Sequence, residues 1–261
     1  MERVPVLVSR AGPVTTITID RPERMNALDY AARVAMAEAF DAFAADPSQW
    51  VAIVTASGDR AFSAGLDLKE LGAAAGNMPE MPPSGFGGLT DRMDLAKPVI
   101  AAVNGLAAGG GFELALACDI VVAADHAWFA LPEPDVGLAA LAGGLVRLAR
   151  AVGEKRATEI ALTRRRIPAA EALVLGLVTD VVAASDLQET ARALARQLCA
   201  AGPLAQRATK QIIQRSLGTT LAEAMRAQWS YPAVEALLAS SEPAEGARAF
   251  VEKRSADWWR P

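Results

Sequence analysis

The chain has 261 residues, of which 52% are hydrophobic and 21% are charged, and it carries a formal net charge of −4. This length and apolar content support one large domain, or a domain with a helical extension, around a substantial core. The acidic balance argues against a nucleic-acid-binding surface, and no apolar run is long enough to cross a membrane. The two cysteines, Cys118 and Cys199, have no metal-ligand spacing. We therefore expect a cytoplasmic protein with reduced thiols, and with no nucleic acid, membrane or metal as a partner.

The N-terminal part of the chain predicts a mixture of strands and helices. Two β-branched apolar runs flank Arg10-Ala11-Gly12-Pro13, which is typical of a β-hairpin. Asp29 precedes a long segment with helical periodicity and is a suitable helix N-cap. The elements expected in this part are strands at Val4–Ser9, Val14–Asp20 and Trp50–Thr55 and helices at Asp29–Ala44 and Asp67–Leu71.

Residues 72–90 are rich in glycine, proline and methionine and have no periodic pattern. Two interpretations are open for this segment. It is a mobile lid over an apolar pocket, to which its methionines would adapt, or it is an ordinary surface loop. A short helix at Leu89–Leu95 is expected to lead from this segment into the next strand.

The segment 99–119 has the strongest chemical signal in the chain. An apolar run, Val99–Val103, is followed by three consecutive glycines, 109–111, and then by a helix-forming run. A glycine run that opens a helix leaves unpaired N–H groups beside a surface that a ligand can approach, and the helix dipole adds partial positive charge. Such a place suits an anion or a developing oxyanion. Glu113 would lie beside these donors, although a first-turn Glu is also common as a plain dipole partner.

Two nucleotide-binding motifs are excluded by the same glycine pattern. No Gly-Lys-Ser or Gly-Lys-Thr follows the glycines, so the segment is not a phosphate loop. GLAAGG also lacks the GxGxxG spacing and the later acidic residue of a dinucleotide-binding unit. We therefore expect no nicotinamide cofactor.

The remainder of the chain changes from mixed strand and helix to all helix near residue 185. The expected elements are strands at Ile120–Ala123, Trp128–Ala130 and Val178–Val182, and helices at Leu141–Ala151, Glu154–Leu162, Ala169–Leu175, 186–200, 204–216, 220–238 and 242–254. We divide the chain into an α/β core, residues 1–184, and a C-terminal helical region, residues 185–261. The apolar positions of the helical region exceed what a lone tail can bury, which favours oligomerisation through it.

A second glycine, Gly65, also precedes a helix start. The N–H groups of Leu66 and Gly110 could meet around one carbonyl oxygen, which is the arrangement of an oxyanion hole. Glu113 and Glu133 lie on two elements that leave the same sheet edge, so two carboxylates could flank one substrate. One carboxylate would deprotonate a water molecule, and the other would deliver a proton to carbon.

Four segments, read together, resemble one known family. AFSAGLDLKEL, KPVIAAVNGLAAGGGFELALACDIVVA, FALPEPDVGL and EGARAFVEKR match the enoyl-CoA hydratase/isomerase (crotonase) superfamily in order and spacing. The resemblance covers nearly the whole chain. It implies an α/β fold, a crotonase-like spiral of ββα units with a C-terminal helical trimerisation region. It also implies an acyl-coenzyme A thioester substrate, a homotrimer or a dimer of trimers (a homohexamer), and a role in fatty acid metabolism.

The resemblance also assigns roles to single positions. Leu66 and Gly110 match the two residues whose backbone N–H groups form the oxyanion hole. Glu113 and Glu133 match the two positions that are acidic in hydratases, where they imply a base and a proton donor, respectively. The positions that match coenzyme A-binding residues are Arg24, Ala64, Asp67, Leu68, Lys69, Phe250 and Lys253, of which the last two would reach the coenzyme of a neighbouring subunit. For the basic residues, simple surface charge is the alternative interpretation.

The leading prediction is an enoyl-CoA hydratase, or the reverse dehydratase, that needs no cofactor because coenzyme A is part of its substrate. A double-bond isomerase needs only one carboxylate, so the pair of glutamates favours hydration. Another crotonase-type acyl-CoA reaction and a non-catalytic acyl-CoA-binding protein are further alternatives. One segment departs from the family pattern, because Ala140 replaces a proline and Leu145-Val146 replaces Thr-Gln near the acyl end of the site. This departure leaves the acyl-chain preference open.

Overall fold

Two β-sheets make the centre of the structure, a computed structural model that describes residues 4–73 and 79–259. The six-stranded sheet contains, in spatial order, β1 (Val6–Ala11), β2 (Val14–Ile19), β3 (Val51–Ala56), β5 (Val99–Val103), β7 (Ile120–Ala124) and β10 (Asp180–Val182). The four-stranded sheet contains β4 (Ala61–Ser63), β6 (Leu106–Ala108), β8 (Trp128–Ala130) and β9 (Ile167–Pro168). The pairs β1–β2 and β8–β9 are antiparallel, and the other pairs are parallel.

The chain visits the two sheets alternately, which produces the expected spiral of ββα units. β3, β5 and β7 enter the larger sheet, and β4, β6 and β8 follow them directly into the smaller one. Every residue of β3 and β5 is buried, which explains why both read as continuous apolar runs. Because β4, β6 and β8 run parallel, their carboxyl ends meet at one edge of the smaller sheet.

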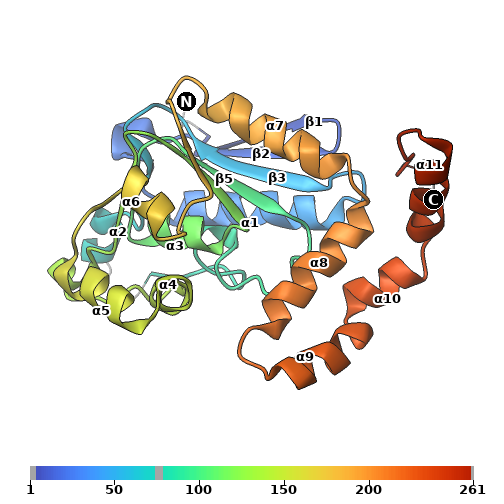
Figure 1. The fold of residues 1–261 in the computed structure, drawn as a ribbon. Coiled ribbons are helices and arrows are strands. Elements are labelled where there is room, and N and C mark those ends of the chain that lie inside the picture. Colours follow the sequence, from blue (N-terminus) through green and yellow to red (C-terminus); the bar gives the residue numbers. More distant parts are fainter. Residues whose placement is uncertain (1–3, 74–78, 260–261) are drawn as a thin grey trace.

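Helices cover both faces of the larger sheet. α1 (Tyr30–Ala45) lies on one face and α7 (Leu187–Cys199) lies on the other (Figure 1). The predicted N-cap of α1 is confirmed, because the Asp29 carboxylate accepts a hydrogen bond from the Ala32 N–H at 3.0 Å. The other helical elements before α7 are η1 (Pro22–Arg24), α2 (Leu68–Ala73), η2 (Phe86–Gly88), α3 (Gly110–Ala117), η3 (Glu133–Val136), α4 (Gly144–Val152), α5 (Glu154–Thr163) and α6 (Ala169–Val174).

The last helices form an arc that extends away from the sheets (Figure 1). They are α8 (Pro203–Ser216), α9 (Leu221–Ala227), η4 (Gln228–Ser230), α10 (Pro232–Leu238) and α11 (Glu242–Glu252). Large apolar side chains on this arc are exposed, among them Leu221 (77%), Trp229 (65%) and Phe250 (86%). None of the helices within the described ranges is long and apolar enough to cross a membrane.

The structure corrects three of the predicted helices. The helix expected at Leu89–Leu95 is absent, and this stretch consists of turns after η2, because a segment so short gains too little to nucleate a helix. The helix expected near 220–238 is broken before Pro232, which lacks an N–H and favours an extended residue before it. The helix expected at Leu141–Ala151 begins at Gly144, since Gly143 has φ +88°, outside the helical region.

The segment 72–90 is only partly described. Residues 74–78 lie outside the described residues, so the prediction of a mobile lid stays a prediction. Residues 72 and 73 belong to α2, and residues 79–90 contain η2 and turns. Phe86, within η2, is buried and forms part of the site described below.

Candidate active site

A cavity of about 320 Å³ lies where the carboxyl ends of β4, β6 and β8 meet. This volume is at the lower end of the range of small-molecule sites. The lining is mostly apolar, and all four charged residues in it are acidic. The cavity is lined by Ala64, Leu66, Leu68, Met81, Gly85, Phe86, Asp91, Gly109, Gly110, Glu113, Pro132, Glu133, Asp135, Val136, Leu138, Ala139, Leu141 and Ala142.

Leu66 is held at the cavity by a backbone bridge to Leu28. The Leu28 N–H donates to the Gly65 carbonyl at 2.7 Å, and the Asp67 N–H donates to the Leu28 carbonyl at 3.2 Å. These two bonds use the groups on either side of the Leu66 nitrogen. Among the described residues, no acceptor takes the Leu66 N–H, so this donor is available to a ligand.

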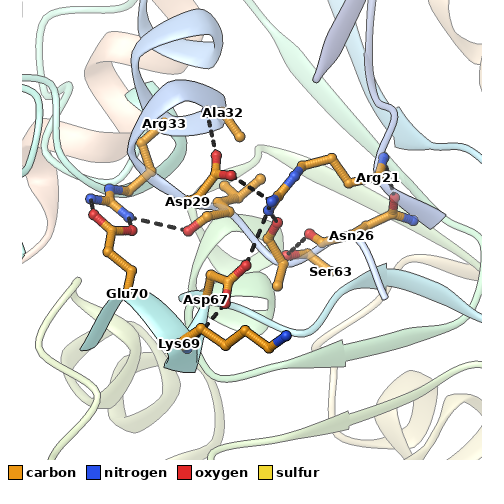
Figure 2. A network of polar contacts seen from close by, with 11 residues as sticks. Arg21, Asn26, Asp29, Ala32, Arg33, Ser63, Asp67, Lys69 and Glu70 are labelled. Carbon is orange, nitrogen blue, oxygen red and sulfur yellow. Dashed lines mark hydrogen bonds and ion pairs between the residues drawn. The ribbon is translucent and has the colours of Figure 1, made fainter. Parts of the chain in front are cut away.

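Polar contacts beneath this loop fix its path (Figure 2). Arg21 lies between the carboxylates of Asp29 and Asp67 and forms ion pairs with both. The fully buried Arg33 forms two hydrogen bonds with Glu70, at 2.8 and 2.9 Å, and thereby ties α1 to α2. Paired, bidentate contacts of this kind define geometry more than they add stability. The chain that follows Leu66 is therefore held at Asp67 and at Glu70.

Gly110 provides the second candidate donor at the start of α3. The first N–H groups of a helix have no partner within the helix, and no described acceptor takes the Gly110 N–H. A methyl group on Gly65 would lie 2.8 Å from the Gly110 nitrogen, and a methyl group on Gly110 would lie 2.6 Å from the Phe86 ring. Glycine at both positions therefore allows the two donor loops and Phe86 to approach one another closely.

Glu113 lies one turn into α3 and is only 4% exposed. Its Oε1 accepts a hydrogen bond from the Gly144 N–H, the first of α4, at 2.9 Å. Burial raises the pKa of Glu113 to about 7, and the neighbouring negative charge of Glu133 acts in the same direction. The backbone N–H groups of Gly144 and Ala142 and the positive charge of Arg147 oppose this shift. A carboxyl group with a pKa near neutrality can exchange a proton under physiological conditions.

Glu133 begins η3, directly after β8 and Pro132, and faces the same cavity. Burial raises the pKa of Glu133 as well. Its Oε2 is buried and has no hydrogen-bond partner in the described part of the chain, while its Oε1 would lie 3.0 Å from a methyl group on Gly109. Unsatisfied buried carboxyl oxygens are uncommon and are typical of sites that bind a ligand or water. The two glutamates therefore share one cavity beside two free N–H donors.

The structure gathers part of the predicted coenzyme-binding set at this cavity. Ala64 and Leu68 line it, together with the predicted donors and both glutamates. Asp67 instead pairs with Arg21, and the exposed Lys69 and Arg24 lie outside the lining. Phe250 and Lys253 lie on or after α11, at the far end of the helical arc from α2 and α3 (Figure 1).

The similarity to known proteins extends over almost the whole chain. The family model described as enoyl-CoA hydratase/isomerase matches residues 9–261. The chain belongs to the enoyl-CoA hydratase/isomerase family. It is 46% identical over 258 residues to the carnitinyl-CoA dehydratases of Salmonella arizonae and Salmonella typhi, which covers 96% of this chain and 97% of each relative.

Solved structures of the family share this fold. An enoyl-CoA hydratase of Mycobacterium marinum is 38% identical, has a TM-score of 0.91, and matches over 98% of this chain and 99% of its own. A carnitinyl-CoA hydratase of Mycobacterium avium is also 38% identical, with a TM-score of 0.76 and 99% of both chains covered. The α/β crotonase fold is thus confirmed, and the chain is an enzyme of the hydratase/dehydratase type in a family that acts on acyl-CoA thioesters.

A larger cavity of about 640 Å³ lies elsewhere in this hydratase/isomerase family member, and its lining includes residues of β2, the end of β3 and α7. Its lining contains hydroxyl side chains, His126 and two arginines, but none of the predicted site residues. We assign the chemistry to the smaller cavity, because it brings together buried carboxylates and free N–H donors.

Several residues of the site are absent from the sequence-based prediction. Phe86 comes from a segment without periodicity and Asp91 directly follows it, while Leu141 comes from the segment that departs from the family pattern and Arg147 directly follows that one. The pair Gly143-Gly144 was the available signal, because two glycines before a helix mark a second set of free N–H groups. In the folded chain the Gly144 N–H donates to Glu113. Spacing along the chain does not reveal this contact.

Proposed function

We propose that this protein is an enoyl-CoA hydratase, which adds water across the 2,3 double bond of a 2-enoyl-CoA thioester or catalyses the reverse dehydration. The observation that carries the proposal is the meeting of Glu113 and Glu133 in one cavity with the free N–H groups of Leu66 and Gly110. Hydration needs both a base and an acid, whereas a double-bond shift needs one carboxylate to move one proton.

The backbone donors would stabilise the negative charge that develops during the reaction. When water attacks C3 of the conjugated thioester, charge accumulates on the thioester oxygen. Leu66 and Gly110 would donate to that oxygen in a cavity with a mostly apolar lining. Losing one such preorganised donor typically costs about 3–4 kcal/mol of transition-state stabilisation.

The two glutamates would divide the proton transfers. Glu113, whose carboxylate is supported by Gly144, would take a proton from the attacking water. Glu133, whose pKa is raised by burial and which lacks stabilising side-chain partners among the described residues, would deliver a proton to C2. The net reaction adds one water molecule and leaves both carboxyl groups exchanged in protonation state, which solvent then resets.

The direct test is turnover of a panel of enoyl-CoA thioesters of different chain length, starting with crotonyl-CoA. The absorbance of the conjugated thioester should fall as the 3-hydroxyacyl-CoA forms. Product analysis must show that water has been added, because a double-bond shift also removes conjugation. Tight binding of several thioesters with no water addition would favour an isomerase, another acyl-CoA reaction or a non-catalytic binder.

A second candidate substrate is carnitinyl-CoA, which the 46% identical relatives are named for. The specific observation in its favour is that the charged residues lining the cavity, Asp91, Glu113, Glu133 and Asp135, are all acidic. The aromatic ring of Phe86 lines the same space. Carboxylates and aromatic faces are the groups that recognise a quaternary ammonium ion.

Charge recognition can be separated from shape recognition with a matched pair of substrates. The enoyl-CoA with a terminal trimethylammonium group should be compared with its neutral isostere, which carries a tert-butyl group. A cation site predicts a higher kcat/KM for the charged thioester, and a loss of that preference in Asp91→Asn. Equal kcat/KM values for the charged and the neutral thioester would contradict a cation site and favour neutral enoyl groups as substrates.

We further propose a homotrimer or a dimer of trimers assembled through α8–α11. The exposed apolar side chains on these helices support this assembly. In such an assembly, Phe250 and Lys253 would approach the coenzyme bound to a neighbouring subunit, while Arg24, Ala64, Asp67, Leu68 and Lys69 would serve their own subunit. We propose that no cofactor is needed, and that the enzyme works in the cytoplasm.

A further inference from the structure

Glu113 must carry a negative charge in a place that disfavours it. Its side chain is almost fully buried, and Glu133 shares its cavity. Burial and the Glu133 charge together raise the pKa of Glu113 to about 7. A base must lose its proton before it can act, so the working fraction of enzyme depends on whatever stabilises the ionised form.

The first support for this charge is the beginning of α4. The Gly144 N–H donates to Glu113 Oε1 at 2.9 Å, at the positive end of a nine-residue helix. A methyl group on Gly144 would lie 2.6 Å from Cγ of Glu113, so only glycine allows this approach. The position of the first turn of α4 therefore determines how well the carboxylate is held.

Arg147, three residues further along α4, fixes that turn. Its Nη2 donates to the Thr90 carbonyl at 2.7 Å, and its Nη1 donates to the Ala142 carbonyl at 3.4 Å. These contacts join the start of α4 to the turn after η2. Phe86, in η2 itself, packs against Gly110. Arg147 is half-buried and does not line the cavity, so it acts from behind Glu113.

The positive charge of Arg147 acts on Glu113. Among the described residues, no acidic side chain forms an ion pair with its guanidinium. The charged and titratable groups that face Arg147 are Glu113 from α3, Cys118 directly after α3, Asp91 from the turn after η2, and Arg150 from α4 itself. Those that face Glu113 are Glu133 and Arg147. Arg147 is thus the one cation near Glu113 in the described part of the chain.

We propose that Arg147 is a positioning residue that favours the ionised form of Glu113 and holds its carboxylate at the cavity, through its positive charge and by fastening the first turn of α4. The inference rests on the proposed hydratase function, in which Glu113 is the base. It adds to the site a residue that lies behind the cavity lining. This residue directly follows the segment whose sequence departs from the usual family pattern.

The first experiment is the pH dependence of kcat/KM for hydration of the best enoyl-CoA substrate. In Arg147→Met the acidic limb should move to higher pH by about 0.5–1 unit, because an opposite charge close to a carboxyl group lowers its pKa. Arg147→Lys, which keeps the charge, should retain most of the wild-type midpoint. The matched control is Arg150→Met, a loss of the same charge from an exposed position on α4, which should leave the midpoint unchanged.

The second experiment needs no turnover. Carbon NMR of protein labelled at the glutamate carboxyl carbons follows each carboxyl group through its titration, and Glu113 is identified by the signal missing in Glu113→Gln. The Glu113 midpoint should rise in Arg147→Met and stay in place in Arg150→Met. If Arg147→Met does not fold, Arg147→Gln removes the same charge but keeps a hydrogen-bond donor for Thr90.

If Arg147→Met lowers kcat/KM equally at every pH, and neither the kinetic midpoint nor the NMR midpoint of Glu113 moves, the proposal is overturned. Arg147 would then have a purely structural role. A wild-type protein that does not hydrate any enoyl-CoA would refute the proposed function instead. In that case the NMR titration still decides whether Arg147 controls the ionisation of Glu113.

Discussion

At the scale of single residues, the two glutamates differ in what surrounds them. The Glu113 carboxylate accepts a hydrogen bond from the N-terminus of α4 and lies near the positive charge of Arg147. Glu133 has one buried carboxyl oxygen without a partner among the described residues. The N–H donor and the cation act against the effect of burial at Glu113, but burial still raises the pKa of Glu113 to about 7, and it raises the pKa of Glu133 as well. The sequence predicted both residues as the catalytic pair, but their different surroundings come from segments far away along the chain.

Replacing either glutamate by glutamine should remove hydration while the fold stays intact. Glu113→Gln and Glu133→Gln each keep size and polarity but lose one proton-transfer group, which typically supplies 10²–10⁴-fold in rate. Steady-state turnover, thermal melting and acyl-CoA binding measure the three parts of this prediction. Near wild-type turnover in either variant would exclude the two-carboxylate mechanism.

Glu113 should also lower the stability of the fold at neutral and alkaline pH. Its folded-state pKa of about 7 lies above the ordinary value of 4.5, so the native state keeps a proton that the unfolded chain loses as pH rises through this interval. Stability is lost between these two values, and Glu113→Gln should regain it. At pH 8 the gain should be at most about 3 kcal/mol, and it should vanish near pH 4.

Denaturant unfolding at both pH values measures this difference. The control is Glu235→Gln, which makes the same change at an exposed position on α10 and should leave stability unchanged. An equal effect of Glu113→Gln at both pH values would show that the burial of its charge costs nothing.

At the scale of elements, the site depends on turns that follow parallel strands. The sequence predicted the turns after β4 and β6 well, because Gly65 and Gly109-Gly110 each precede a helix-forming run. It failed at the wall formed by residues 85–92, where the path depends on packing against α1 rather than on periodicity. A methyl group on Gly88 would lie 2.5 Å from Cα of Ala37 in α1, a contact no local pattern reveals.

Gly65→Ala should abolish turnover by separating the two donor loops. The added methyl group would meet the Gly110 nitrogen at 2.8 Å, and Gly65 has φ +87°. Gly176→Ala is the matched control, because Gly176 also has a positive φ (+72°) but has nothing within 4 Å of the added methyl group. Both variants should lose roughly 1–2 kcal/mol of stability from backbone strain.

Turnover and thermal melting together separate the two effects of Gly65→Ala. Only Gly65→Ala should lose hydration, whereas Gly176→Ala should melt earlier and remain active. A folded and fully active Gly65→Ala protein would exclude close approach of the two donor loops.

At the scale of the whole molecule, the spiral buries its apolar strands, whereas the helical arc exposes large apolar side chains. The recurrent strand and helix pattern predicted a wound α/β core, and the family resemblance implied the spiral of ββα units. The arc presents apolar side chains that an isolated chain leaves in water, with Phe250 86% and Val251 79% exposed. The exposure of these side chains supports the assembly proposed through α8–α11.

Charged substitutions on the arc should dissociate the proposed assembly. Leu221→Glu combined with Phe250→Glu places charges at positions that are 77% and 86% exposed in the single chain, where burial against a partner would make them costly. Sedimentation should show a lower mass for this variant. Val174→Glu, at an 85% exposed position on α6, should keep the wild-type mass, and a monomeric wild-type protein would contradict the assembly.

The central claim is that water adds to an enoyl thioester between Glu113 and Glu133. The most direct measurement is the reaction of the purified enzyme with enoyl-CoA thioesters in water labelled with heavy oxygen, followed by mass spectrometry of the products. The account predicts a 3-hydroxyacyl-CoA that carries one labelled oxygen, formed by the wild type and not by Glu113→Gln or Glu133→Gln. A product whose double bond has moved and which carries no label would contradict the account.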